Sequence, residues 1–131
     1  MNFEKSLKIL KYAGLVFLGI FAVLLLWWAV LGGIHSAQSR QIIKDSKAIT
    51  QALEYFYKDQ GRYPSTGEYA DQNIMRQYLS NFPPRDFPSD VCPQSFQYAN
   101  NFRNDYELRI CLPKAVSGYS AGWNRIKSPA K

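Results

Sequence analysis

The chain has 131 residues, of which 47% are hydrophobic, and it carries a formal net charge of +6 at pH 7. This length leaves room for one small domain with one modest core and excludes a multidomain enzyme. The apolar residues are concentrated near the N-terminus, so an apolar segment is followed by a more polar domain of fewer than 100 residues.

The apolar segment covers residues 13–34, which contain no charged side chain. As a helix rising ~1.5 Å per residue, it is long enough to cross the ~30 Å hydrocarbon core of a bilayer. It is longer than the roughly 7–15 apolar residues of a signal peptide, and Val30-Leu31-Gly32 matches a signal cleavage site poorly. We therefore expect a transmembrane helix that is retained in the lipid bilayer.

The charges that flank this segment set its orientation only weakly. Lys5, Lys8 and Lys11 precede it, and His35, Arg40, Lys44 and Lys47 follow it. The two cysteines, Cys92 and Cys111, both lie in the distal domain, and an even count in a small exported module is typical of a disulfide; two free thiols in a cytosolic domain are the alternative. We expect a Cys92–Cys111 disulfide, residues 1–12 in the cytoplasm and residues 35–131 outside the membrane.

After the apolar segment, a helical period continues. Apolar or small residues recur at steps of three and four: Ile42, Ser46, Ile49, Leu53, Phe56 and Tyr57. Polar residues fall on the opposite face: Lys44, Lys47, Gln51, Glu54 and Lys58. This pattern predicts an amphipathic helix that ends at about Asp59, just before Gly61, and buries the stripe Ile42, Ile49, Leu53 and Phe56.

The rest of the chain is predicted to form short helices, strands and loops. Turn residues occupy 63–67, a short helix is expected over Asn73–Ser80, and three prolines in Phe82–Pro88 require an ordered loop there. Three runs of aromatic and branched residues predict strands: Ser95–Ala99, Tyr106–Leu112 and Gly118–Trp123. A long N-terminal helix, transmembrane and then amphipathic, packed on a small three-stranded antiparallel sheet is an α+β fold.

The segment Ser39–Pro64 resembles a known family. Ala52 and Leu53, followed by Phe56 or Tyr57 and then by Gly61, Tyr63 and Pro64, are similar to the helix exit of type IV pilin-like proteins and of type II secretion pseudopilins, especially the G-type. The resemblance continues more loosely through the later loop and strands. It implies the same fold, a structural role, other pilin-like subunits or secretion and pilus machinery as partners, and the bacterial cytoplasmic membrane as the location.

The chain departs from that family at its N-terminus. Family members carry a leader that the prepilin peptidase removes before Phe-Thr-Leu-Ile-Glu, whereas Gly14 is followed here by Leu-Val-Phe-Leu-Gly, and the span contains no glutamate. The prepilin peptidase motif is therefore lacking, and we expect the mature chain to keep Met1 and its anchor.

No constellation of residues favours catalysis. His35 has no cysteine or carboxylate partner within a helical turn, and Asp86 with Asp90 are too few for calcium, so we expect them to cap the loop. The aromatic residues of the strands, Tyr98, Phe102, Tyr106, Tyr119 and Trp123, could form a platform for nucleic acid, but charges of both signs alternate around them and a core role is favoured.

These patterns predict a non-catalytic, membrane-anchored, pilin-like structural protein without a cofactor or a metal, and with no specific nucleic acid as a partner. The alternative is a membrane-tethered binding or sensor module that does not form filaments. An enzyme is the least favoured class, because no nucleophile and base can be paired from these residues.

Overall fold

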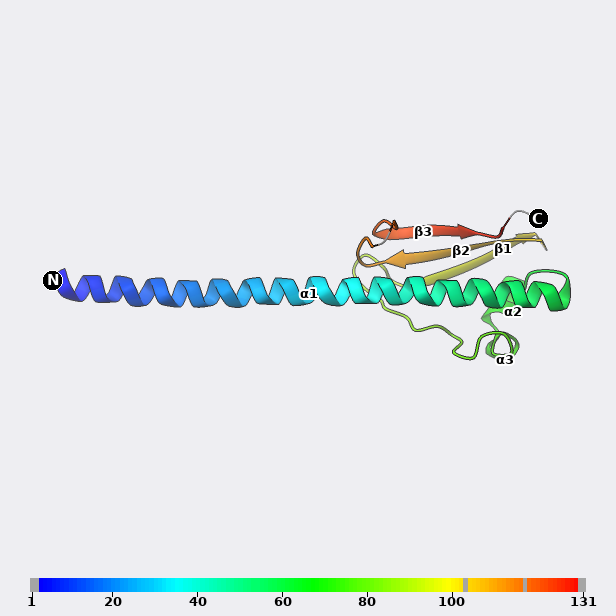
Figure 1. The fold of residues 1–131 in the computed structure, drawn as a ribbon, viewed down its shortest axis with the longest axis horizontal. Helices are drawn as coiled ribbons and strands as arrows, with labels where there is room; N and C mark the ends of the chain where they lie inside the picture. The colour runs from blue at the N-terminus through cyan, green and yellow to red at the C-terminus, as the bar shows by residue number, and fades with distance from the viewer. Residues whose placement is uncertain (1–2, 103, 117, 130–131) are drawn as a thin grey trace. The chain divides into compact units, whose positions relative to one another are not determined.

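A computed structural model describes residues 3–102, 104–116 and 118–129. For residues 3–7 and 101–102 it describes the backbone only. The elements in chain order are α1 (Phe3–Gln60), α2 (Thr66–Ala70), α3 (Gln72–Met75), β1 (Phe96–Phe102), β2 (Asp105–Leu112) and β3 (Gly122–Lys127) (Figure 1). The chain divides into two compact units, Met1–Ile34 and His35–Lys131. The fold is α+β, as the sequence predicts.

The first unit is helical and apolar. By length and composition, α1 is the one helix in the described part of the chain that could cross a membrane. Its large apolar side chains are exposed; Phe17 is 79% exposed and Trp28 is 82% exposed. A helix satisfies its own backbone hydrogen bonds, so such a segment can be accommodated in hydrocarbon, where those side chains would be buried.

In the second unit, residues 35–60 of α1 present the predicted stripe to the sheet. Ile42, Ile49 and Leu53 are completely buried, and Phe56 is 3% exposed. The helix ends where Gly61, with a φ of 69°, donates its N–H to the carbonyl of Tyr57 at 2.8 Å. A left-handed residue at this position is the usual way to close a helix, and glycine adopts it without strain.

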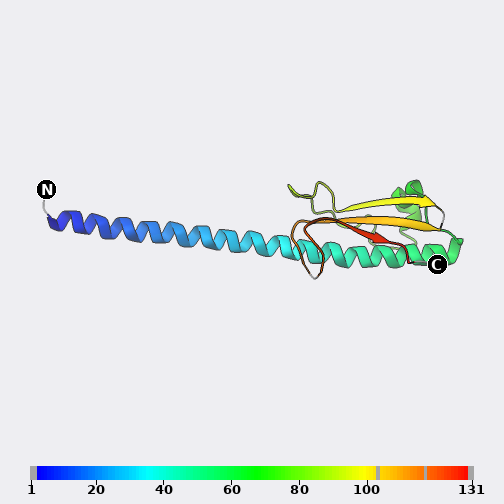
Figure 2. The ribbon, with the colours of Figure 1, turned by 90° about the horizontal axis from the view of Figure 1, so that it is seen from above.

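The sheet has the order β1-β2-β3 with both pairs antiparallel (Figures 1 and 2). In the central strand Tyr106, Leu108 and Ile110 are buried and join the core that contains the helix stripe. Alternation of side chains along a strand places Glu107 and Arg109 on the other face. The core therefore lies between one face of the sheet and residues 35–60 of α1.

Two of the predicted element positions are wrong. The third strand is Gly122–Lys127 rather than Gly118–Trp123, because Val116 and Tyr119 pair with each other in a local bridge and Gly122, at a φ of 85°, turns the chain into the strand. The second helical region is α2 and α3 rather than one helix over Asn73–Ser80. Helix α2 begins with a capping box, in which Ser65 Oγ accepts from the N–H of Glu68 while the Glu68 carboxylate accepts from the N–H of Ser65.

The proline-rich loop between α3 and β1 is anchored in the part that leads into β1. Asp86 Oδ1 accepts the backbone N–H of Ser95 at 2.7 Å, and Ser95 Oγ accepts the N–H of Phe87 at 2.8 Å. Cys92 and Cys111, both buried, form a disulfide with their Cα atoms 5.6 Å apart. The loop is therefore tied to the central strand by a covalent bond and to the start of β1 by side-chain hydrogen bonds.

Candidate functional site

A groove of about 800 Å³ lies within the second unit, between α1 and the segment that follows α3. From α1 it is lined by one side of the helix, namely Gln41, Lys44, Asp45 and Ala48. These positions are spaced three and four residues apart, so they share a face that is distinct from the buried stripe. The opposite wall is formed by residues 76 and 79–85. We call this site the cationic groove, because Lys44, Arg76 and Arg85 line it.

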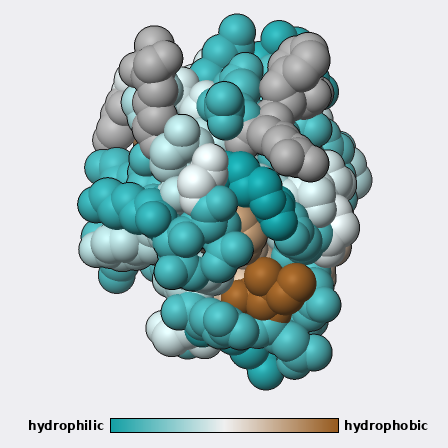
Figure 3. Space-filling view, turned by 90° about the vertical axis from the view of Figure 1, so that its right-hand side faces the viewer, coloured by the Kyte–Doolittle hydropathy of each residue, from teal (hydrophilic) through white to brown (hydrophobic). Residues whose placement is uncertain are grey.

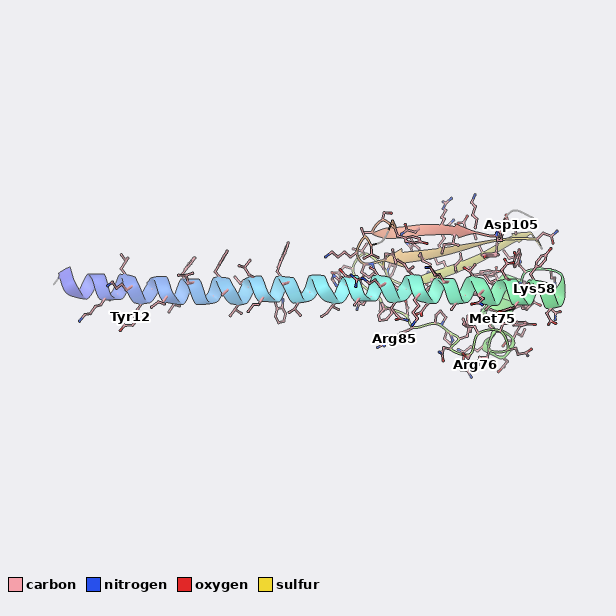
Figure 4. The ribbon with its side chains drawn as sticks, in the orientation of Figure 1. Tyr12, Lys58, Met75, Arg76, Arg85 and Asp105 are labelled. Atoms are coloured by element: carbon pink, nitrogen blue, oxygen red, sulfur yellow. A yellow bond between two sulfur atoms is a disulfide. The ribbon has the colours of Figure 1, made fainter. Side chains whose placement is uncertain are left out.

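Three cations and one carboxylate line the cationic groove: Lys44, Arg76, Arg85 and Asp45. The carboxylate is already engaged, since Gln41 Nε2 donates to Asp45 Oδ1 at 2.7 Å. Because three cations line the groove against one carboxylate, the lining carries an excess of positive charge. Figure 4 shows Arg76 and Arg85 on the side of α1 opposite to the strands in that view.

The two arginines are positioned by their neighbours. Arg76 donates from Nε to the carbonyl oxygen of Phe82 and from Nη2 to Gln72 Oε1, both at 3.2 Å. The guanidinium of Arg85 lies over the ring of Phe87, 5.2 Å from its centroid. A guanidinium has five N–H donors, so Arg76 keeps further donors for a ligand.

The remaining lining residues are of two kinds. Apolar contacts come from Ala48, Leu79, Phe82, Pro83 and Pro84. Uncharged polar groups come from Gln41, Ser80 and Asn81. Ligand sites in proteins commonly combine such apolar walls with a few polar groups, in volumes of roughly 300–1,000 Å³. By size and composition, the cationic groove fits a ligand that is both anionic and partly apolar.

The outer face of the sheet is another charged surface. Arg109 on β2 lies directly opposite Arg125 on β3, and like charges in that position repel. Glu107 relieves the repulsion: its Oε1 is 2.5 Å from Arg109 Nε and 3.7 Å from Arg125 Nε, and its pKa is lowered chiefly by the hydrogen bond from Arg109. This carboxylate holds two arginines together and is a structural group.

The aromatic residues of the sheet do not form one platform. Tyr106 is buried, and Tyr98 donates its hydroxyl hydrogen to the carbonyl of Pro64 at 2.6 Å. Trp123 is 40% exposed and Tyr119 is partly buried. The side chain of Phe102 lies outside the described residues. A row of bases stacked on this sheet is therefore not supported by the described side chains.

Several tyrosines in the core or packed against it have a raised pKa because they are wholly or partly buried. Burial is the largest cause for Tyr63, Tyr69 and Tyr98, and Tyr63 also donates a hydrogen bond to Glu54 Oε1 at 2.6 Å. These phenols stay protonated at neutral pH. They contribute ring contacts and hydrogen bonds to the core, as in the stacked pair Tyr69 and Tyr98 with centroids 4.2 Å apart.

The residues considered as metal ligands are either exposed or engaged in capping a loop. His35 is exposed, and so is Asp90. Asp86 caps the loop by accepting two backbone N–H groups, those of Phe87 and Ser95. Over the described residues, no group of three histidine, cysteine, aspartate or glutamate side chains is placed to hold a metal ion.

The end of the domain at which α1 finishes offers little apolar surface. Figure 3 shows this end as mostly hydrophilic, with one small hydrophobic patch. A patch of that kind is ordinary on a monomeric protein. The cationic groove, which sequence analysis missed, is therefore the candidate site. The helical period places Lys44 on the polar face of the helix, and nothing local in the sequence links it to Arg76 or Arg85.

The chain matches no protein-family model, no curated protein and no solved structure.

Proposed function

We propose that this chain is a non-catalytic, membrane-anchored protein of the pilin-like kind, related to type IV pilus or type II secretion assemblies. The observation that supports it best is the arrangement of one helix and one sheet. An apolar helical segment precedes an amphipathic segment, whose stripe Ile49, Leu53 and Phe56 is buried against three antiparallel strands. The helix exit Gly61 to Pro64 has the residues of that resemblance, and Tyr63 and Pro64 are both buried.

The state of the ionisable groups supports a structural role. Functional sites tend to collect groups with perturbed pKa values in one cleft. Here the lowered pKa of Glu68 has the Arg62 hydrogen bond as its largest cause, and that of Asp59 the hydrogen bond from Tyr78. None of these residues lines the cationic groove. These two pairs therefore serve to fasten the segment of α2 and α3 to the chain at the end of α1.

Assembly is tested by site-specific cross-linking of the full chain in bacterial membranes. A photoreactive residue at Lys47, which is exposed on α1, should form adducts with a second copy or with another pilin-like subunit. The same residue at Gln97, exposed on the outer face of the sheet, serves as a control for random collision. Recovery of the chain in the soluble fraction, or equal labelling from both positions, would contradict the proposal.

A second function, a membrane-tethered binding module, is favoured by one observation, the cationic groove. Its volume lies within the range of ligand sites, and its lining combines charge with apolar contact. The two functions differ in what they require. A filament subunit must meet other copies, whereas a binding module needs only a ligand.

A further inference from the structure

We propose that the cationic groove binds an extended, acidic peptide segment of a partner protein, one in which glutamate or aspartate residues alternate with apolar residues. The inference concerns the second function above and does not depend on filament assembly. It rests on the charges, the dimensions and the mixed lining of the groove.

The charges favour a ligand with more than one carboxylate. Lys44 comes from α1, Arg76 from the end of α3 and Arg85 from the proline-rich loop, so the cations are contributed by separate parts of the fold. Asp45 offsets only one of these three cations, so the lining keeps an excess of positive charge. Complementary charge of this kind selects acidic partners and excludes basic ones.

The dimensions favour a chain segment over a small anion. A volume of about 800 Å³ far exceeds what one phosphate ion fills. Leu79, Pro83 and Pro84 supply apolar surface along the wall, and a simple anion would leave that surface in water. Apolar side chains between the carboxylates of a peptide would cover it.

The uncharged polar groups suit a peptide backbone. Gln41, Ser80 and Asn81 line the same groove and carry both donors and acceptors. An extended peptide presents one N–H and one carbonyl per residue, which need partners once they leave water. A lipid tail has no such groups. The combination of cations, apolar contacts and amide-compatible side chains therefore points to a peptide.

The test uses the full chain in neutral-lipid nanodiscs and a fluorescent six-residue peptide of alternating glutamate and leucine, followed by anisotropy. We expect saturable binding that weakens as salt is added, because exposed charges are screened. Lys44→Ala and Arg85→Ala should each weaken binding about tenfold, as expected for loss of one charge-assisted contact. Peptides with glutamine or lysine in place of glutamate should not bind.

Lys47→Ala is the matched control, because it removes the same charge from the same helix. Lys47 is exposed and does not line the groove. The substitution should change the affinity less than about twofold if contacts in the groove dominate over net charge. Equal weakening by Lys44→Ala and Lys47→Ala, or the absence of saturable binding, would overturn the proposal. Displacement of the peptide by an equal concentration of inorganic phosphate, or by anionic lipid vesicles, would also overturn it, in favour of a phosphate site or a membrane contact.

Discussion

Ser39 and Lys114 meet across 75 residues of sequence and exchange two hydrogen bonds. Ser39 Oγ donates to the carbonyl of Lys114 at 2.8 Å, and the N–H of Lys114 donates back to Ser39 Oγ at 3.1 Å. Ser39 is completely buried. One hydroxyl on α1 thus satisfies both backbone groups of a residue in the connection between β2 and β3.

Ser39→Ala should destabilise the domain by about 1–3 kcal/mol, because two backbone groups would lose a buried partner. The free energy of unfolding, measured by urea titration, is the check. Ser80→Ala is the control, since Ser80 is exposed, and it should change stability by less than ~0.5 kcal/mol. Equal effects of the two substitutions would show that the Ser39 contact adds nothing.

Leu53→Ala should cost about 2–5 kcal/mol, the usual loss when a large core side chain is truncated. Leu53 is completely buried between α1 and the sheet. Lys47→Ala, on an exposed position of the same helix, should cost less than ~0.5 kcal/mol. Thermal unfolding followed by circular dichroism distinguishes the two. A harmless Leu53→Ala would mean that the helix does not pack on the sheet in solution.

Replacing Cys92 and Cys111 together by serine should lower the free energy of unfolding by ~3 kcal/mol in the chain-entropy account of a loop of this size. The two cysteines are 19 positions apart in the sequence. Unfolding of the unmodified chain with and without a reducing agent gives the same comparison without a substitution. Finding two free thiols in the denatured, unreduced protein would refute the bond itself.

Stability should fall in acid partly through Glu68. Arg62 Nη1 and Nη2 donate to the two carboxylate oxygens of Glu68 at 2.6 Å each, and the N–H of Ser65 donates at 2.8 Å. These bonds lower the pKa of Glu68 from 4.5 to about 2, with the Arg62 hydrogen bond as the main cause. A lowered pKa means that the folded chain binds the proton less well than the unfolded chain does.

The contribution of Glu68 is therefore complete above pH 4.5 and is lost as the pH falls toward 2. Glu68→Gln should reduce the slope of stability against pH in that window, as measured by urea midpoints. A residual slope is expected, because the pKa values of Asp59 and Glu107 are also lowered. An unchanged slope in the variant would show that the pair with Arg62 does not form.

The sequence predicts the parts of this fold that repeat regularly. The stripe of residues 42–56 carries a period of 3.6, and Tyr106 to Leu112 alternates, so both elements are found with their correct faces. The sequence does not predict helix α2, because Gly67 and the preceding Pro64 are typical of turns. Its signal was present all the same, since Ser65 and Glu68 have the spacing of a capping box.

The third strand and the cationic groove depend on contacts between distant residues. Tyr119 has the aromatic character of a strand residue, but the pairing of Leu112 with Gly122 sets where β3 begins. In the groove, Lys44 meets residues 76–85 only after α1, α3 and the loop have packed. Neither the start of β3 nor the lining of the groove produces a periodic pattern in the sequence, so neither could be predicted from it.

The bond between Cys92 and Cys111 has a consequence for anything that binds in the groove. The loop that supplies Arg85 is joined covalently to the central strand a few residues later. A wall held in this way loses less conformational entropy when it accepts a ligand. By thermodynamic reciprocity, a ligand that prefers the ordered loop favours the disulfide over the two thiols by the same factor. Binding of the proposed ligand and oxidation of Cys92 and Cys111 would then be thermodynamically coupled.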